Sequence, residues 1–83
     1  MALELARDRI RVNAIAPGYF ATDINAEFLA SEGGRRLLSR VPMGRPGELA
    51  ELDGALLLLA SNAGAFMTGS VITVDGGHLL AMG

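Results

Sequence analysis

The sequence predicts an α/β fold in which two parallel β-strands are joined through helices. Residues 10–16 alternate apolar and polar side chains and then continue apolar, which is typical of a strand with a buried second half. Residues 46–60 have the composition of a helix, and residues 71–74 are a β-branched strand. A strand–helix–strand order implies a crossover and therefore parallel strands. Because two strands cannot form a sheet with both faces covered, we expect a partial domain.

The first two elements are a helix and a strand. Residues 2–8 are strong helix formers without a visible N-cap, so we expect the last turns of a longer helix. The strand over 10–16 should end at Pro17-Gly18. Proline removes a donor from the strand ladder, and glycine allows unusual backbone angles.

Residues 19–44 form an unusually long connection. We expect two short helices in it, at 25–31 and 34–40, separated by Gly33-Gly34. A connection of this length inside a compact domain often serves as a lid over a functional site.

The second main helix is the clearest element of the sequence. Pro46 suits its first turn, Glu48 and Glu51 suit the positive end of its dipole, and residues 62–64 should stop it. Residues 54–60 are apolar on every face, which predicts burial against more than one neighbour. The strand over 71–74 should then end at Asp75-Gly76-Gly77.

The composition excludes several classes of protein. The net charge is −2, with seven arginines and no lysine, so neither nucleic acid nor an anionic membrane is expected as a partner. There are no cysteines and no metal-ligand spacing of His, Asp or Glu. The longest apolar run, residues 54–60, is far shorter than the ~20 residues that span a bilayer. With no signal-peptide pattern at the N-terminus, we expect a cytoplasmic location.

The balance of apolar and charged residues is unusual for so short a chain. Apolar residues make up 51% of the 83 and charged residues 19%. A chain of this size buries only about 60–65% of its unfolded surface, so its own core is marginal. We therefore expect other chain, or partner subunits, to cover part of it.

A candidate site lies just beyond the first strand. In open parallel sheets, ligands bind beyond the carboxyl ends of the strands, which here means Pro17-Gly18 and the residues after them. Gly18 lets a flat ligand approach the backbone, while the Phe20 backbone and the Thr22 hydroxyl form a donor–acceptor array that suits a planar carboxamide. The alternative is that Pro17-Gly18 merely turns the chain.

The run from Arg11 to Gly18 (Arg-Val-Asn-Ala-Ile-Ala-Pro-Gly), together with Thr22, Thr68-Gly69 and the run Val74-Asp75-Gly76-Gly77, resembles the C-terminal third of the short-chain dehydrogenase/reductase family. The resemblance implies the last two parallel strands, the helices and the lid of a Rossmann-type, doubly wound sheet. Residues 1–83 would then be the C-terminal part of one domain, with residues 19–44 as its substrate lid. It also implies an oxidoreductase that uses NAD or NADP to interconvert a secondary alcohol and a carbonyl.

The same resemblance assigns roles to four residues. Pro17 and Gly18 would lie beside the nicotinamide ring, and the Phe20 backbone and Thr22 side chain would bond its carboxamide. The family's catalysis uses a Ser and a Tyr-x-x-x-Lys pair, but this sequence has no lysine and its one tyrosine is Tyr19. We therefore assign no catalytic residue and expect the isolated chain to be inactive.

The resemblance also implies a dimer or tetramer formed through the final helix and strand. An alternative is a truncated, non-catalytic module that only self-associates.

The sequence suggests roles for several other polar and aromatic residues, and for some of them two roles are possible. Tyr19 could line the substrate pocket or pack within the loop. His78 is expected at a surface or interface, and Asp53 in an interior salt link with an arginine. The cluster of Arg35, Arg36 and Arg40 is expected to be a solvated face, with recognition of an anionic substrate as the alternative.

Overall fold

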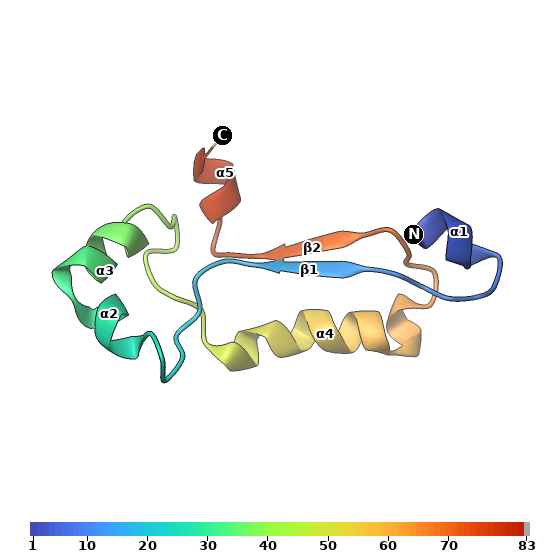
Figure 1. Cartoon of the computed structure of the whole chain (residues 1–83), viewed down its shortest axis with the longest axis horizontal. Helices are drawn as coiled ribbons and strands as arrows, with labels where there is room; N and C mark the ends of the chain where they lie inside the picture. The colour runs from blue at the N-terminus through green and yellow to red at the C-terminus, as the bar shows by residue number, and fades with distance from the viewer. Residues whose placement is uncertain (83) are drawn as a thin grey trace.

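The computed structural model describes residues 1–82, and Gly83, the last residue of the expected 1–83 domain, lies outside them. Two parallel strands, β1 (Ala14–Pro17) and β2 (Val71–Val74), pair along their whole length. The helix α4 (Asp53–Ala60) runs alongside them, as Figure 1 shows. The predicted α/β architecture with parallel strands and a helical crossover is therefore confirmed.

The first strand differs from the expected 10–16 at both ends. Residues before Ala14 use side chains as well as backbone: the Asn13 amide donates to the Met67 carbonyl at 3.0 Å and accepts from the Ser70 N–H at 3.0 Å. The Val12 carbonyl accepts the Gly69 N–H at 2.8 Å. At the other end, β1 extends one residue beyond 16 and ends at Pro17, within the expected Pro17-Gly18. The N–H groups of Ala14 and Gly18 face the second strand, so position 17 needs no donor on that side.

Gly18 continues the chain without the unusual backbone angles expected there, since it is not among the glycines with positive φ. The expectation that unusual glycine angles end the strand at Gly18 is therefore wrong. The chain leaves β1 in an extended form and reaches Phe20, which pairs with Gly47 in an isolated parallel bridge.

The connection 19–44 contains the two expected short helices, α2 (Ala26–Ala30) and α3 (Glu32–Leu38). They separate at Ser31 rather than at the glycine pair. The Ser31 hydroxyl accepts the Gly34 N–H at 3.2 Å, so it caps α3 and places both glycines in the first turn. A Cβ on Gly34 would lie 2.1 Å from the Phe28 carbonyl oxygen, which explains the glycine by the close approach of the two helices.

The remaining helices are shorter than expected or begin later. The first, α1 (Ala2–Ala6), is followed by Arg9 at φ 63°, a left-handed conformation that commonly follows a helix end. The second main helix begins as a 3₁₀ turn, η1 (Leu49–Leu52), not at Pro46, and leads directly into α4. A second 3₁₀ turn, η2 (Asn62–Gly64), follows α4 where a stop was expected, and α5 (His78–Met82) follows β2.

Burial is concentrated in the connection 19–44. The buried apolar residues of the described chain are Leu29, Leu38 and Val41. By contrast, Leu56 and Leu57 of α4 are 57% and 65% exposed. The expected burial of residues 54–60 on every face is therefore not provided by residues 1–82.

The overall shape agrees with this distribution of burial. The radius of gyration is 15.7 Å, whereas a compact domain of this length would have about 12 Å. Figure 1 shows the cause: the helices α2 and α3 project beyond one end of the strands and α1 lies at the other end. Within the described residues, no helix is long and apolar enough to cross a membrane.

Candidate functional site

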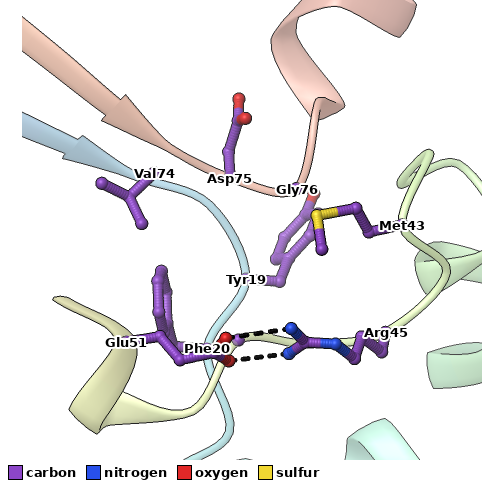
Figure 2. A pocket seen from close by; sticks show the side chains of 9 residues that line it. Tyr19, Phe20, Met43, Arg45, Glu51, Val74, Asp75 and Gly76 are labelled. Carbon is purple, nitrogen blue, oxygen red and sulfur yellow. Dashed lines mark hydrogen bonds and ion pairs between the residues drawn. The ribbon is translucent and has the colours of Figure 1, made fainter.

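The candidate site lies where β1 and β2 end. There the chain leaving β1, the turn after β2 and the end of the connection 19–44 come together around a hollow of about 150 Å³, shown in Figure 2. The hollow is lined by Tyr19, Phe20, Met43, Arg45, Gly47, Glu51, Val74, Asp75 and Gly76. Of the four residues expected to bind a cofactor, Phe20 lines this hollow, and Pro17, Gly18 and Thr22 lie in the same segment.

Gly18 is held against the neighbouring strand's exit. A Cβ there would lie 2.6 Å from the Asp75 Cβ, so no other residue fits without moving the backbone. The Asp75 carboxylate in turn accepts the N–H groups of Gly77 and Leu79, both at 2.9 Å, and so orders the start of α5. The packing of the two strand ends thus explains this glycine.

Phe20 and Thr22 are fixed by one side chain, Asn25. The Asn25 amide nitrogen donates to the Phe20 carbonyl at 2.8 Å, and its amide oxygen accepts the Thr22 N–H at 2.7 Å. The Thr22 hydroxyl accepts the Asn25 N–H at 3.3 Å, which leaves its own hydrogen free to donate elsewhere. The array expected at Phe20 and Thr22 is therefore held in one conformation by Asn25, which is not among the expected cofactor-binding residues.

The far end of the connection 19–44 is bonded to the same region. The Met43 N–H donates to the Gly76 carbonyl at 3.1 Å. Gly76 and Gly77 have φ of 63° and 91°, and a Cβ on them would lie 3.0 Å from Val41 and 3.1 Å from Pro42. The Asp75-Gly76-Gly77 sequence, expected as a strand end, thus also allows the connection to pack against the β2 exit.

Arg45 and Glu51 form a bidentate ion pair beside the hollow. The guanidinium donates to the two carboxylate oxygens at 2.7 and 2.9 Å, as the dashed lines in Figure 2 show. The hydrogen bond from Arg45, followed by that from the Glu48 N–H, lowers the pKa of Glu51 to about 2. The same pairing raises the pKa of Arg45. Both groups therefore stay charged at neutral pH.

The other polar and aromatic residues considered in the sequence differ in where the structure places them. Tyr19 packs edge-on against His78, with ring centroids 5.2 Å apart, and both also border a second, larger hollow near α3 and α5. Asp53 is exposed, and neither ion pair found in residues 1–82 includes it, so its expected salt link is wrong. The three arginines of the cluster, Arg35, Arg36 and Arg40, are exposed.

Three residues that hold the site were not assigned to it from the sequence. Asn25 follows Thr22 by three residues, a spacing that permits reciprocal capping and that could have revealed it. Glu51 was expected to act on a helix dipole and also pairs with Arg45. The sequence around Arg45 does not indicate its ion pair with Glu51. The two residues are six positions apart, so their contact depends on how the intervening loop folds.

This arrangement can bind and orient a planar polar group, but offers little chemistry of its own. It presents backbone groups, one hydroxyl and an ion pair whose charges already neutralise each other. Among the described residues, no group of three or more His, Asp or Glu side chains could hold a metal ion.

Comparisons with known proteins cover nearly the whole chain. A family model described as enoyl-(acyl carrier protein) reductase matches residues 1–78. The chain is 47% identical over 79 residues to the short-chain dehydrogenase/reductase VdtF of Byssochlamys spectabilis, covering 95% of this chain and 26% of that protein. It is 43% identical over 83 residues to 5-keto-D-gluconate 5-reductase of Escherichia coli strain K12, covering 99% of this chain and 33% of that protein.

A solved structure is similar over the same span. The gluconate 5-dehydrogenase of Burkholderia cenocepacia J2315, in complex with NADP and tartrate, is 40% identical with a TM-score of 0.85. The match covers 96% of this chain and 32% of that one. The chain thus spans between a quarter and a third of the length of these relatives.

Proposed function

This chain belongs to the short-chain dehydrogenase/reductase family of Rossmann-fold oxidoreductases, and from that premise we propose the function of the protein that contains it. The protein interconverts a secondary alcohol and a carbonyl with NAD or NADP as cofactor. Residues 1–83 supply the nicotinamide side of the cofactor site, the substrate lid at 19–44 and an oligomer surface. The Ser, Tyr and Lys used by the family for catalysis come from outside this sequence, which contains no lysine.

The observation that carries the proposal is the fixed, extended segment that leaves β1. Pro17 is exposed, Gly18 has no side chain and packs against the exit of β2, and the Thr22 hydroxyl is held by Asn25 with its hydrogen free. These features fit the nicotinamide end of the cofactor, which would supply the hydride. Neither strand among the described residues is followed by the Gly-x-Gly-x-x-Gly spacing that binds a pyrophosphate at a helix N-terminus, so we assign the pyrophosphate to another part of the protein.

The roles of this chain's residues follow from that fit. Pro17 and Gly18 allow a flat ring to lie against the backbone, while the Phe20 backbone and Thr22 hydroxyl bond its carboxamide. These bonds select which ring face meets the substrate, and hydride transfer depends strongly on that orientation. The chain's residues thus bind and orient, and they move no proton.

A chimera tests the proposal directly. Residues 1–83 would replace the matching segment of the Escherichia coli 5-keto-D-gluconate 5-reductase, whose alignment covers 99% of this chain. We expect reduction of 5-keto-D-gluconate by the folded chimera, and no turnover by the purified 83-residue chain with any alcohol. A folded but inactive chimera, or turnover by the isolated chain, would contradict the proposal.

A second candidate function is a non-catalytic module that associates with itself. It is favoured by the exposed apolar side chains of α4, Leu56 and Leu57, in a sequence without lysine. Size-exclusion chromatography with light scattering separates the two. A stable, well-folded homo-oligomer of the isolated chain without cofactor would favour the module, whereas aggregation would favour a segment of a larger enzyme.

A further inference from the structure

The loop from Arg45 to Glu51 is closed by its own side chains. The Arg45 guanidinium and the Glu51 carboxylate form the bidentate pair, which we call the clasp. One oxygen of the same carboxylate also accepts the Glu48 N–H at 2.9 Å, and the guanidinium donates to the Pro46 carbonyl at 3.1 Å. The loop backbone between the two charges is therefore bonded at two points to the groups that close it.

Gly47, inside this closed loop, is bonded to the segment that leaves β1. Its N–H donates to the Tyr19 carbonyl at 2.8 Å, and its carbonyl accepts the Ala21 N–H at 2.9 Å. The Phe20 ring covers it so closely that a Cβ on Gly47 would lie 2.4 Å from the ring. The position of the loop and the position of the Phe20 backbone therefore cannot change independently.

We propose that Arg45 and Glu51 are positioning residues for the cofactor segment: the clasp fixes Gly47, and Gly47 fixes the backbone from Tyr19 to Thr22. This rests on the proposed function, because it assigns the bonding of nicotinamide to that segment. The clasp borders the hollow in Figure 2, and it acts through Gly47 rather than by touching the reacting atoms.

Because the clasp is partly exposed, its positioning role can be tested separately from a contribution to the overall stability of the fold. The Arg45 and Glu51 side chains are 47% and 43% exposed, and ion pairs in such positions contribute little to folding. Removing the clasp should therefore loosen the bridge to Phe20 while the chain stays folded.

The test uses the chimera with the Escherichia coli reductase and the variants Arg45→Ala and Glu51→Gln. Glu51→Gln keeps an oxygen that can accept the Glu48 N–H but removes the charge. It therefore tests the ion pair separately from the hydrogen bond to the Glu48 N–H. We expect the cofactor KM to rise about three- to tenfold in both variants, with the KM for 5-keto-D-gluconate changed less than about twofold. Arg45→Lys should recover part of the loss, because one ammonium cannot form both bonds.

Arg7→Ala is the matched control, since Arg7 is an exposed arginine that directly follows α1. The helix α1 lies at the far end of the strands (Figure 1). It should leave every kinetic constant unchanged. A rise in the cofactor KM of similar size in Arg7→Ala, or none in Arg45→Ala, would overturn the proposal.

Hydrogen exchange of backbone amides gives a readout independent of activity. In Arg45→Ala, the N–H groups of Ala21 and Gly47 should exchange faster, while those of Ala14 and Gly18 in the strand pairing should not change. Unchanged exchange at Ala21 and Gly47 would overturn the inference even in an active chimera. An inactive but folded parent chimera contradicts the proposed function alone, whereas a parent that does not fold contradicts both.

Discussion

The Thr22 hydroxyl has two bonds to make. It accepts the Asn25 N–H at 3.3 Å within the chain, and its hydrogen is free for the proposed carboxamide bond. The Thr22 N–H is held separately by the Asn25 side chain at 2.7 Å. The backbone at this residue is therefore fixed largely by Asn25, and the hydroxyl can be tested with little change in the loop.

Thr22→Val removes the hydroxyl and keeps the branched shape. In the active chimera we expect the cofactor KM to rise about five- to tenfold, the usual effect of losing one hydrogen bond of about 1–1.5 kcal/mol. Steady-state kinetics with varied NADPH and NADH measure it. Thr22→Ser keeps the hydroxyl and should stay close to the parent; unchanged cofactor affinity and turnover in Thr22→Val would count against the carboxamide contact.

At the scale of elements, the boundary between α2 and α3 is set by Ser31 and not by the two glycines that follow it. Ser31 caps α3 and ends α2 in an extended conformation, with φ −77° and ψ 170°. Gly33 and Gly34 then lie in the same helical turn but in different surroundings. Gly33 meets only ordinary contacts, at 3.6 Å and beyond, whereas Gly34 faces the α2 backbone.

This difference predicts opposite effects of one substitution at adjacent positions. Gly33→Ala should stabilise the folded chimera by up to about 1 kcal/mol, because alanine loses less backbone entropy in a helix. Gly34→Ala should destabilise it by about 1–3 kcal/mol, because the new Cβ cannot be accommodated without separating the helices. Urea unfolding measures both; equal effects at the two sites would show that α2 and α3 do not pack closely.

The Arg45–Glu51 pair makes the stability of the loop 45–51 sensitive to acid. The folded pKa of Glu51, about 2, lies below its usual 4.5. The stabilisation by this pair is therefore complete above about pH 4.5 and is lost as the pH falls through 2.

NMR titration of the Glu51 side-chain carboxyl should give a midpoint near 2, with little change between pH 5 and 8. In Arg45→Ala, the midpoint should move up toward the usual value for a glutamate. A midpoint near 4.5 in the parent would show that the pair does not persist in solution.

At the scale of the whole molecule, the apolar surface is much larger than the core. Leu29, Leu38 and Val41 are buried, while Leu57, Val71 and Phe66 are 65%, 65% and 104% exposed. Large apolar side chains that are exposed in such numbers are typical of a protein surface that other protein covers. The proposed oligomer surface includes this part of the chain.

Leu57→Gln tests that surface in the chimera. If a second subunit covers Leu57, the substitution should shift the protein toward a smaller assembly by light scattering and lower its melting temperature. Ile24→Gln is the control, because Ile24 is 97% exposed and belongs to the connection 19–44 rather than to α4. An unchanged mass in Leu57→Gln would contradict an oligomer contact at this residue.

Several features followed from the sequence because they depend on neighbouring residues. The β-branched run at 71–74 formed β2 with the expected bounds, and the helical composition before Ala60 formed α4. The crossover between strands fixed their parallel direction, and the absence of lysine excluded the family's catalytic pair from these residues. The candidate segment from Pro17 to Thr22 was also placed correctly at the ends of the strands.

Other features depended on residues that are distant in the chain, and only the tertiary structure decided them. Pro17 joined β1 because the pairing with β2 needs no donor there, and Gly18 is explained by the approach of Asp75, 57 positions away in sequence. The link between Gly47 and Phe20 likewise spans the whole connection 19–44. Local propensity says where a strand or helix can form, whereas the contacts between strand ends and loops depend on how the whole chain packs.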